Sequence, residues 1–156
     1  MIRIEPMTAE HIEQIHQLEK LCFPEDAWSM STFKMELENS FSTYIVACEN
    51  SVVLGYAGMH HVLDEAEIVN IAVSPNFRGQ KIGNQLMQGL MTGILELGIT
   101  AITLEVRASN SHAISLYQNY GFMPISIRTN YYRKPLEDAI VMQKINSATE
   151  ADHEKT

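Results

Sequence analysis

The segment from Val69 to Asn84 constrains the fold of this chain more than any other part of the sequence. It reads VNIAVSPNFRGQKIGN, so an apolar, β-branched run stops at a turn and a short loop with spaced glycines opens a helix. A strand, loop and helix in this order leave unpaired backbone N–H groups at the helix N-terminus, a geometry that binds phosphate. Arg78 and Lys81 add positive charge there, although the formal net charge of the chain is −8. We therefore expect this loop to bind an anionic ligand.

The spacing of Gly79 and Gly83 excludes two common phosphate-binding loops. A Walker A loop needs four residues between its first glycine and Gly-Lys-Ser/Thr, and a dinucleotide fingerprint needs G-x-G-x-x-G. Read from Arg78, the segment resembles the Q/R-x-x-G-x-G/A loop of GCN5-related N-acetyltransferases (GNAT), which wraps the pyrophosphate of coenzyme A. Lys81 replaces the first of the two later glycines, so it must avoid a positive φ or adopt it at a cost. An ordinary glycine-containing turn before a core helix is the alternative.

Length and composition indicate one globular domain. The chain has 156 residues, of which 46% are hydrophobic, and we expect a single domain over residues 1–145 with a polar, disordered tail over 146–156. No apolar stretch approaches the length that spans a bilayer, and the N-terminus has no hydrophobic signal region, which favours a cytoplasmic protein without a membrane partner. Cys22 and Cys48 lie in apolar contexts typical of buried, reduced thiols.

Charge and histidine spacing argue against two further classes of ligand. The acidic balance disfavours direct binding of nucleic acid, although it is compatible with a basic peptide or amine. The six histidines show no paired metal-ligand spacing, so we predict no metal.

Hydrophobic periodicity predicts an α/β (α+β) fold in which a mixed sheet of about seven strands is flanked by about four helices. The predicted strands are Ile2–Glu5, Thr43–Glu49, Val52–His61, Glu67–Ser74, Ala101–Arg107, Met123–Arg128 and Asp138–Ile145. The predicted helices run from a Thr8 cap to Pro24, from Ser29 or Ser31 to Asn39, from Gly83 to Leu97, and from Ser109 or Asn110 to Tyr120. This order matches the GNAT fold.

Two side chains are candidates for proton transfer. Glu105 is a lone carboxylate in the apolar strand AITLEV, and a buried carboxylate of this kind suits general-base catalysis. Tyr117 lies in the following helix, and its phenol could protonate a departing thiolate. The alternatives are that Glu105 pairs with Arg107 or lies at an exposed strand end, and that Tyr117 is a core aromatic residue.

Longer motifs resemble one branch of the GNAT superfamily, the ribosomal-protein N-terminal acetyltransferases of the RimI type. The matching segments are LEVRASN (104–110), AISLY (113–117), YGF (120–122), LDEA (63–66), NIAV (70–73), NYY (130–132) and EDAIVM (137–142). Together they extend over most of residues 1–145. The resemblance implies the acyl-CoA N-acyltransferase fold, with the sheet splayed between its fourth and fifth strands.

The resemblance also implies roles for individual residues. Glu105 would be the general base, Tyr117 the general acid, and the Val73 N–H an oxyanion donor. Acetyl-CoA would be bound by Ile71, Ala72, Val73, Arg78, Gly79, Gln80, Lys81, Ile82, Gly83, Asn84 and Asn110. Trp28, Tyr131 and Tyr132 would bind the acceptor peptide, although Trp28 could instead anchor the core between two helices.

The activity implied by the resemblance is acetylation of a protein α-amine. The acceptor would be the N-terminal alanine of the eighteenth protein of the small ribosomal subunit, attacked directly on acetyl-CoA in a ternary complex. The alternatives are a GNAT that acts on lysine side chains or small amines, and a non-catalytic acyl-CoA-binding module.

Overall fold

The computed structural model describes residues 1–79 and 81–146. Its strands are β1 (Arg3–Pro6), β2 (Ser42–Glu49), β3 (Val52–Val62), β4 (Glu65–Val73), β5 (Ala101–Arg107), β6 (Met123–Arg133) and β7 (Leu136–Ile145). Its helices are α1 (Ile12–Cys22), α2 (Met30–Glu38), α3 (Ile82–Glu96) and α4 (Ser111–Asn119), with short 3₁₀ turns η1 (Ala9–His11) and η2 (Pro75–Phe77). Within these ranges, the predicted number and order of strands and helices are confirmed.

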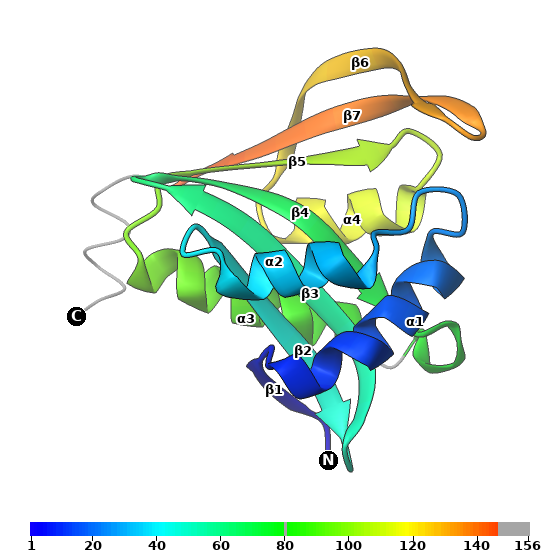
Figure 1. Cartoon of the computed structure of the whole chain (residues 1–156). Helices are drawn as coiled ribbons and strands as arrows, with labels where there is room; N and C mark the ends of the chain where they lie inside the picture. The colour runs from blue at the N-terminus through cyan, green and yellow to red at the C-terminus, as the bar shows by residue number, and fades with distance from the viewer. Residues whose placement is uncertain (80, 147–156) are drawn as a thin grey trace.

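One twisted sheet forms the middle of the molecule, with strand order β1-β2-β3-β4-β5-β7-β6. Helices α1 and α2 cover one face, and α3 and α4 cover the other (Figure 1). Neighbouring strands are antiparallel except β4 and β5, which are parallel. Each face therefore has its own apolar core, and the two cores share the central strands.

The sheet opens between β4 and β5. The two strands pair only from Glu65 opposite Ala101 to Ile68 opposite Leu104, and β5 then continues along β7 alone. Where β4 leaves β5, the register of β4 with β3 shifts by one residue at Val69, which is a β-bulge. The predicted splay between the fourth and fifth strands is therefore present, and the ends of β4 and β5 line a gap that runs through the sheet.

Helix α3 begins beside this gap and buries one apolar face, which includes Leu86, Leu90 and Ile94. It ends before Gly98, which has a φ of +71° that suits glycine after a helix. At 15 residues, α3 is the longest helix of the described part. No helix in that part is long and apolar enough to cross a bilayer.

Besides strand ends that differ from the prediction by one or two residues, two predicted boundaries are wrong. Strand β6 continues to Arg133 rather than stopping at Arg128, because Asn130 adopts a φ of +54° within a register shift and pairing resumes at Tyr132 opposite Glu137. Asn146, assigned to the tail, is 8% exposed and donates its backbone N–H to the Thr100 carbonyl oxygen at 2.7 Å. It belongs to the folded domain. The remaining residues of the predicted tail, 147–156, lie outside the described residues.

Candidate active site

The open edge of β4 presents the backbone of Ile71 and Val73. The Ser74 N–H donates to the Leu54 carbonyl oxygen at 2.8 Å, and the register places Val73 opposite Gly55. Residues of an antiparallel ladder alternate between those that bond to the neighbouring strand and those whose N–H and C=O groups face away from it. Positions 70, 72 and 74 therefore bond to β3, whereas Ile71 and Val73 face the gap. Ala72, predicted to bind cofactor with them, directs its backbone groups to β3.

The start of α3 supplies a second set of free donors. Lys81 is the N-cap residue, and neither its side chain nor any other group described there caps the helix. The Gln85 N–H donates to the Lys81 carbonyl oxygen, and no group of the described residues accepts the N–H groups of residues 82–84, which lie at the end of the helix. These three donors and the helix dipole favour an anion beside the cationic Lys81 side chain.

The glycines of this loop fit a bulky ligand such as the coenzyme A pyrophosphate. Gly79 has a φ of +87°, and a Cβ built there would meet no atom within 4 Å. At Gly83 a Cβ would make only ordinary contacts, 3.6 Å from Leu116 Cδ2 and 3.9 Å from Val73 Cγ2. Packing of the described residues therefore leaves open space in front of Gly79. Gln80, the remaining residue predicted to bind there, lies outside the described residues.

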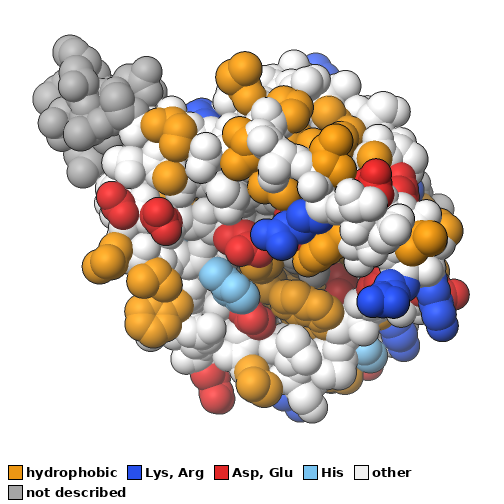
Figure 2. Space-filling view, turned by 90° about the horizontal axis from the view of Figure 1, so that it is seen from above, with side chains coloured by type: hydrophobic (Ala, Val, Ile, Leu, Met, Phe, Trp, Pro, Cys, Tyr) orange, Lys and Arg blue, Asp and Glu red, His pale blue; other side chains and the backbone are white. Residues whose placement is uncertain are grey.

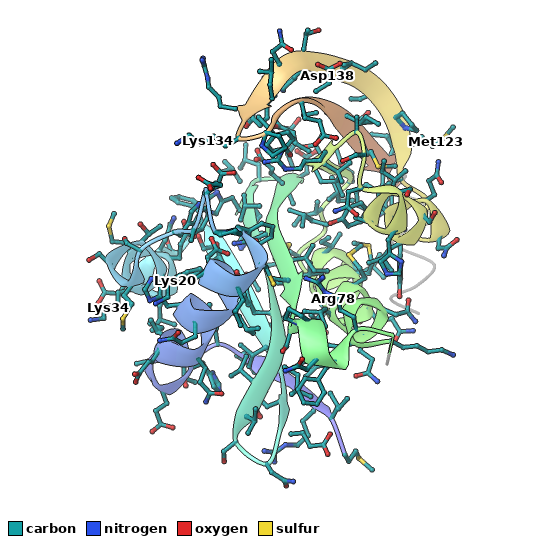
Figure 3. The ribbon with its side chains drawn as sticks, turned by 90° about the vertical axis from the view of Figure 1, so that its right-hand side faces the viewer. Lys20, Lys34, Arg78, Met123, Lys134 and Asp138 are labelled. Carbon is teal, nitrogen blue, oxygen red and sulfur yellow. The ribbon has the colours of Figure 1, made fainter. Side chains whose placement is uncertain are left out.

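Arg78 connects the loop to the open edge of β4. Its Nε donates to the Val73 carbonyl oxygen at 3.4 Å, and its Nη2 lies 3.6 Å from the Cys22 sulfur. Figure 3 shows Arg78 beside the first turn of α3. The side chain is exposed and its guanidinium is turned back toward β4, so it places positive charge at the junction of loop and strand.

Glu105 is the first residue of β5 beyond its pairing with β4, at the edge of the gap. Ile102, Leu104 and Val106 are buried against α3 and α4, so Glu105 points to the face covered by α1 and α2. The expected isolation among apolar neighbours is wrong, because Arg128 of β6 donates from Nε to Glu105 Oε1 at 3.1 Å. The carboxylate is 22% exposed and thus accessible from the gap.

Tyr117 comes from the other face of the sheet. It is buried at 5% exposure, with its ring centroid 6.1 Å from that of Phe122, and burial raises the pKa of its hydroxyl. A smaller contribution comes from Tyr132. Burial and Glu105 together raise the pKa of Tyr132 to about 12, so Tyr132 lies within electrostatic reach of both Glu105 and Tyr117. Glu105 and Tyr117 therefore lie on opposite faces of the sheet, on either side of Tyr132.

Arg107 links the α1–α2 loop to the β6–β7 hairpin, the two segments predicted to border the acceptor peptide. It bonds to Asp26 Oδ2 at 3.4 Å in the α1–α2 loop and to Glu137 Oε1 at 3.3 Å in β7, and its guanidinium lies 4.2 Å from the centre of the Tyr132 ring. Seen from the end that carries β6 and β7, Figure 2 shows acidic, basic and histidine side chains around the middle of this surface. Arg107, the alternative partner predicted for Glu105, thus pairs with Asp26 and Glu137 instead.

The aromatic residues predicted to bind the acceptor peptide differ in exposure and packing. Tyr131 is 49% exposed and packs edge-on against Tyr132, with ring centroids 5.1 Å apart. The neighbouring Glu105 carboxylate has the largest of the effects that raise the pKa of its hydroxyl. Trp28 packs against Phe33 at 5.6 Å and joins the core under α1 and α2, which is the anchoring role considered as its alternative.

Two predicted ligands of acetyl-CoA also have structural roles. Asn110 is the N-cap of α4, where its side-chain oxygen accepts the Ala113 N–H at 3.2 Å and its NH₂ group bonds to none of residues 1–79 and 81–146. The Tyr120 hydroxyl donates to the Asn84 carbonyl oxygen at 2.9 Å and to its side-chain oxygen at 2.5 Å, which ties α4 to the start of α3. Both oxygens of Asn84 are therefore engaged, and its donors, the backbone N–H and the side-chain NH₂ group, bond to no described residue.

The sequence indicated neither of two polar clusters. Glu19 of α1 is 2% exposed and accepts hydrogen bonds from three elements, but in sequence it resembles any polar residue of an amphipathic helix. Glu5, His11 and Cys48 bring three possible metal ligands together. The Thr8 N–H donates to His11 Nδ1 at 2.9 Å, so the proton of a neutral ring sits on Nε2, 3.4 Å from Glu5. In this tautomer Nδ1 already accepts a proton and Nε2 carries one directed at Glu5, which favours a hydrogen-bonded cluster over a metal site.

Comparisons with known proteins agree with this geometry. Residues 12–122 match the model of the acetyltransferase (GNAT) family. The chain is 38% identical over 136 residues to [ribosomal protein bS18]-alanine N-acetyltransferase of Escherichia coli K12, covering 86% of each chain. It is 37% identical over 145 residues to the Haemophilus influenzae protein of the same name, covering 90% of this chain and 94% of that one.

A solved structure shows the same arrangement. The ribosomal-protein-S18-alanine N-acetyltransferase from Escherichia coli superposes with a TM-score of 0.86 at 32% identity, covering 94% of this chain and 95% of that chain. The match of the family model, these relatives and the splayed sheet agree with one another. The chain therefore belongs to the GNAT family of acetyltransferases.

Proposed function

We propose that this protein is an N-terminal α-amine acetyltransferase that acetylates the N-terminal alanine of ribosomal protein bS18. The observation that carries the proposal is the gap between β4 and β5, with Glu105 on one face and Tyr117 on the other. The names of the relatives at 37–38% identity support this choice of acceptor. A ribosomal substrate implies that the reaction takes place in the cytoplasm.

Acetyl-CoA is the acetyl donor of this family and supplies an activated thioester. The N–H groups of residues 82–84, with Lys81, hold its pyrophosphate, and the Val73 N–H donates a hydrogen bond to the thioester oxygen as negative charge develops there. Because the Val73 N–H belongs to a fixed strand edge, little reorganisation is needed at the moment of reaction.

Proton transfers at Glu105 and Tyr117 complete the reaction. Glu105 accepts a proton from the α-ammonium group of the peptide, which leaves a neutral amine to attack the thioester carbon. As the C–S bond breaks, Tyr117 donates its proton to the sulfur, and the raised pKa of its hydroxyl keeps that proton available at neutral pH. As the amide forms, its nitrogen loses a second proton, which passes through water to the Tyr117 phenolate, and Glu105 releases the first proton to solvent. The products are the acetylated peptide, the free thiol and one proton.

Direct transfer to the amine fits the state of the two cysteines. Burial raises the pKa of both the Cys22 and the Cys48 thiols. The thiolate is the nucleophilic form of cysteine, so neither residue has the properties of an acyl-transfer nucleophile. The amine therefore attacks the thioester itself.

Mass spectrometry of peptides incubated with acetyl-CoA tests the proposal. The bS18 N-terminal peptide should gain one acetyl group at its α-amine, and the same peptide with a blocked N-terminus should gain none. Acetylation of a lysine in the blocked peptide would instead support a lysine acetyltransferase. Binding of acetyl-CoA without transfer to any peptide would support a non-catalytic module.

A further inference from the structure

Glu19 is a buried carboxylate that the reaction described above does not use. It lies on α1 at 2% exposure, within the apolar core formed by α1, α2 and the sheet. Among the described residues no lysine, arginine or histidine forms an ion pair with it. A buried carboxylate without a cation needs hydrogen-bond donors directed at it.

Three donors from three different elements satisfy this carboxylate. Oε1 accepts the hydroxyl proton of Tyr56 on β3 and an amide proton from Asn70 Nδ2 on β4, the latter at 3.0 Å. Oε2 accepts the backbone N–H of Trp28, in the loop between α1 and α2, at 2.9 Å. The Glu19 side chain thus links α1 to β3, to β4 and to the α1–α2 loop.

The bond to Asn70 bears on the shape of β4. Ala66 and Ile68 face the core under α3, and a regular strand would turn Asn70 to that same apolar side. The bulge at Val69 reverses the alternation, so Ile71 and Val73 contact the α3 core and Asn70 faces α1, where Glu19 receives it. If the bulge were lost, the Asn70 amide would be buried without this partner.

The same bulge decides which backbone groups reach the gap. With it, the N–H groups of Ile71 and Val73 are free, and those of positions 70 and 72 bond to β3. A shift by one residue would exchange the two sets, and the Val73 N–H would bond to β3. The hydrogen bond between Asn70 and Glu19 is therefore linked to the direction in which the Val73 N–H points.

We propose that Glu19 is a positioning residue for acetyl transfer, which fixes the β4 bulge through Asn70 and the α1–α2 loop through the Trp28 N–H. It touches neither substrate and acts through the strand edge and the loop that it holds. The inference rests on the proposed function, because it assumes that Val73 donates to the thioester oxygen.

Three substitutions separate positioning from simple core stability. Glu19→Gln keeps the shape but places an NH₂ group where one oxygen accepted a donor. Asn70→Ala, at a half-buried position, removes only the bond that holds the bulge. Tyr56→Phe is the matched control, because it removes one donor from the same carboxylate and leaves the bonds to Asn70 and Trp28 intact.

We expect Glu19→Gln and Asn70→Ala to lower kcat about 10- to 100-fold, the scale of a misplaced reacting group. The Kd for coenzyme A should change by a smaller factor than kcat, because no bond of Glu19 reaches the pyrophosphate donors at the start of α3. Tyr56→Phe should lower Tm but keep kcat within about 2-fold. The double variant Glu19→Gln/Asn70→Ala should be no slower than the slower single variant, since the bond that Asn70→Ala removes is one of those that Glu19→Gln disturbs.

Hydrogen exchange followed by NMR gives a readout that needs no turnover. The Ala72 amide, bonded to β3, should exchange at least about 10-fold faster in Asn70→Ala than in the wild type, with Val46 in β2 unchanged. Faster exchange at Ala72 in Asn70→Ala, together with a wild-type protein that acetylates no peptide, would reject the proposed function alone. Wild-type kcat and Ala72 exchange in Asn70→Ala, with only Tm lowered, would overturn the positioning role even if Glu19→Gln fails to fold.

Discussion

Replacing Lys81 with glycine should stabilise the free protein and weaken its binding of acetyl-CoA. Lys81 adopts a φ of +63° and a ψ of +21°, the left-handed conformation that costs a residue with a Cβ about 1–2 kcal/mol. Its charge also stands at the positive end of the α3 dipole, which costs about 0.3–1 kcal/mol more. Glycine removes both costs, but its greater conformational entropy in the unfolded chain lowers the stability by about 0.4–1 kcal/mol. The net gain is about 1 kcal/mol.

The effect on binding has the opposite sign. An exposed lysine beside a phosphate contributes about 0.5–1 kcal/mol, so Lys81→Gly should raise the Kd for acetyl-CoA roughly 2- to 5-fold at low salt. Screening should reduce this difference as the ionic strength rises toward 0.5 M, where the Debye length is only about 4 Å. Lys81 is thus unfavourable in the free protein, and we attribute its presence to the anion it faces.

Lys81→Ala is the matched control, because it removes the same charge and keeps a Cβ at the same φ. Thermal unfolding followed by circular dichroism should give a Tm about 2–4 °C above wild type for Lys81→Gly and closer to wild type for Lys81→Ala. Isothermal titration calorimetry should give both variants the same weakened affinity. Equal Tm values for the two variants would refute the argument from backbone strain, and wild-type affinity in Lys81→Ala would refute the phosphate contact.

Three further predictions concern Tyr117, Glu105 and the Glu137 carboxylate of β7. Tyr117→Phe should lower kcat about 100-fold or more, measured by release of the free thiol, while Tm stays within about 2 °C because the ring keeps its apolar contacts. Glu105→Gln should lower kcat by a similar factor without a change in the Kd for coenzyme A, because an amide cannot accept the proton; near-wild-type turnover would exclude Glu105 as the base. Hydrogen bonds from Ser109 hold the pKa of Glu137 below its ordinary value of 4.5, so the stability they add is present at neutral pH and is lost as the pH falls through the native pKa. The Tm of the wild type should therefore exceed that of Glu137→Gln at pH 7, and the difference should close in a series of unfolding curves taken below about pH 4.

Local patterns in the sequence were sufficient to predict the order of strands and helices. The apolar residues of α3 recur at helical spacing, and Ser29 and Asn110 cap the helices that were expected to begin near them. Such features depend on neighbours in the chain. The pairing of Glu105 with Arg128 does not, because it requires β7 to lie between β5 and β6 with a particular register. The same applies to Arg107, whose partners come from the α1–α2 loop and β7.

The bulge in β4 shows why the geometry of the gap could not be read from residue types alone. The strand EAEIVNIAV is apolar on both sides after Glu67, so alternation cannot locate an inserted residue within it. The polar Asn70 is the one local sign, because a regular strand would turn it into the α3 core. That sign gains meaning only when Glu19, 51 residues earlier in the chain, is known to lie above it. The orientation of the Val73 N–H thus depends on a contact between two polar residues that each appear unremarkable in the sequence.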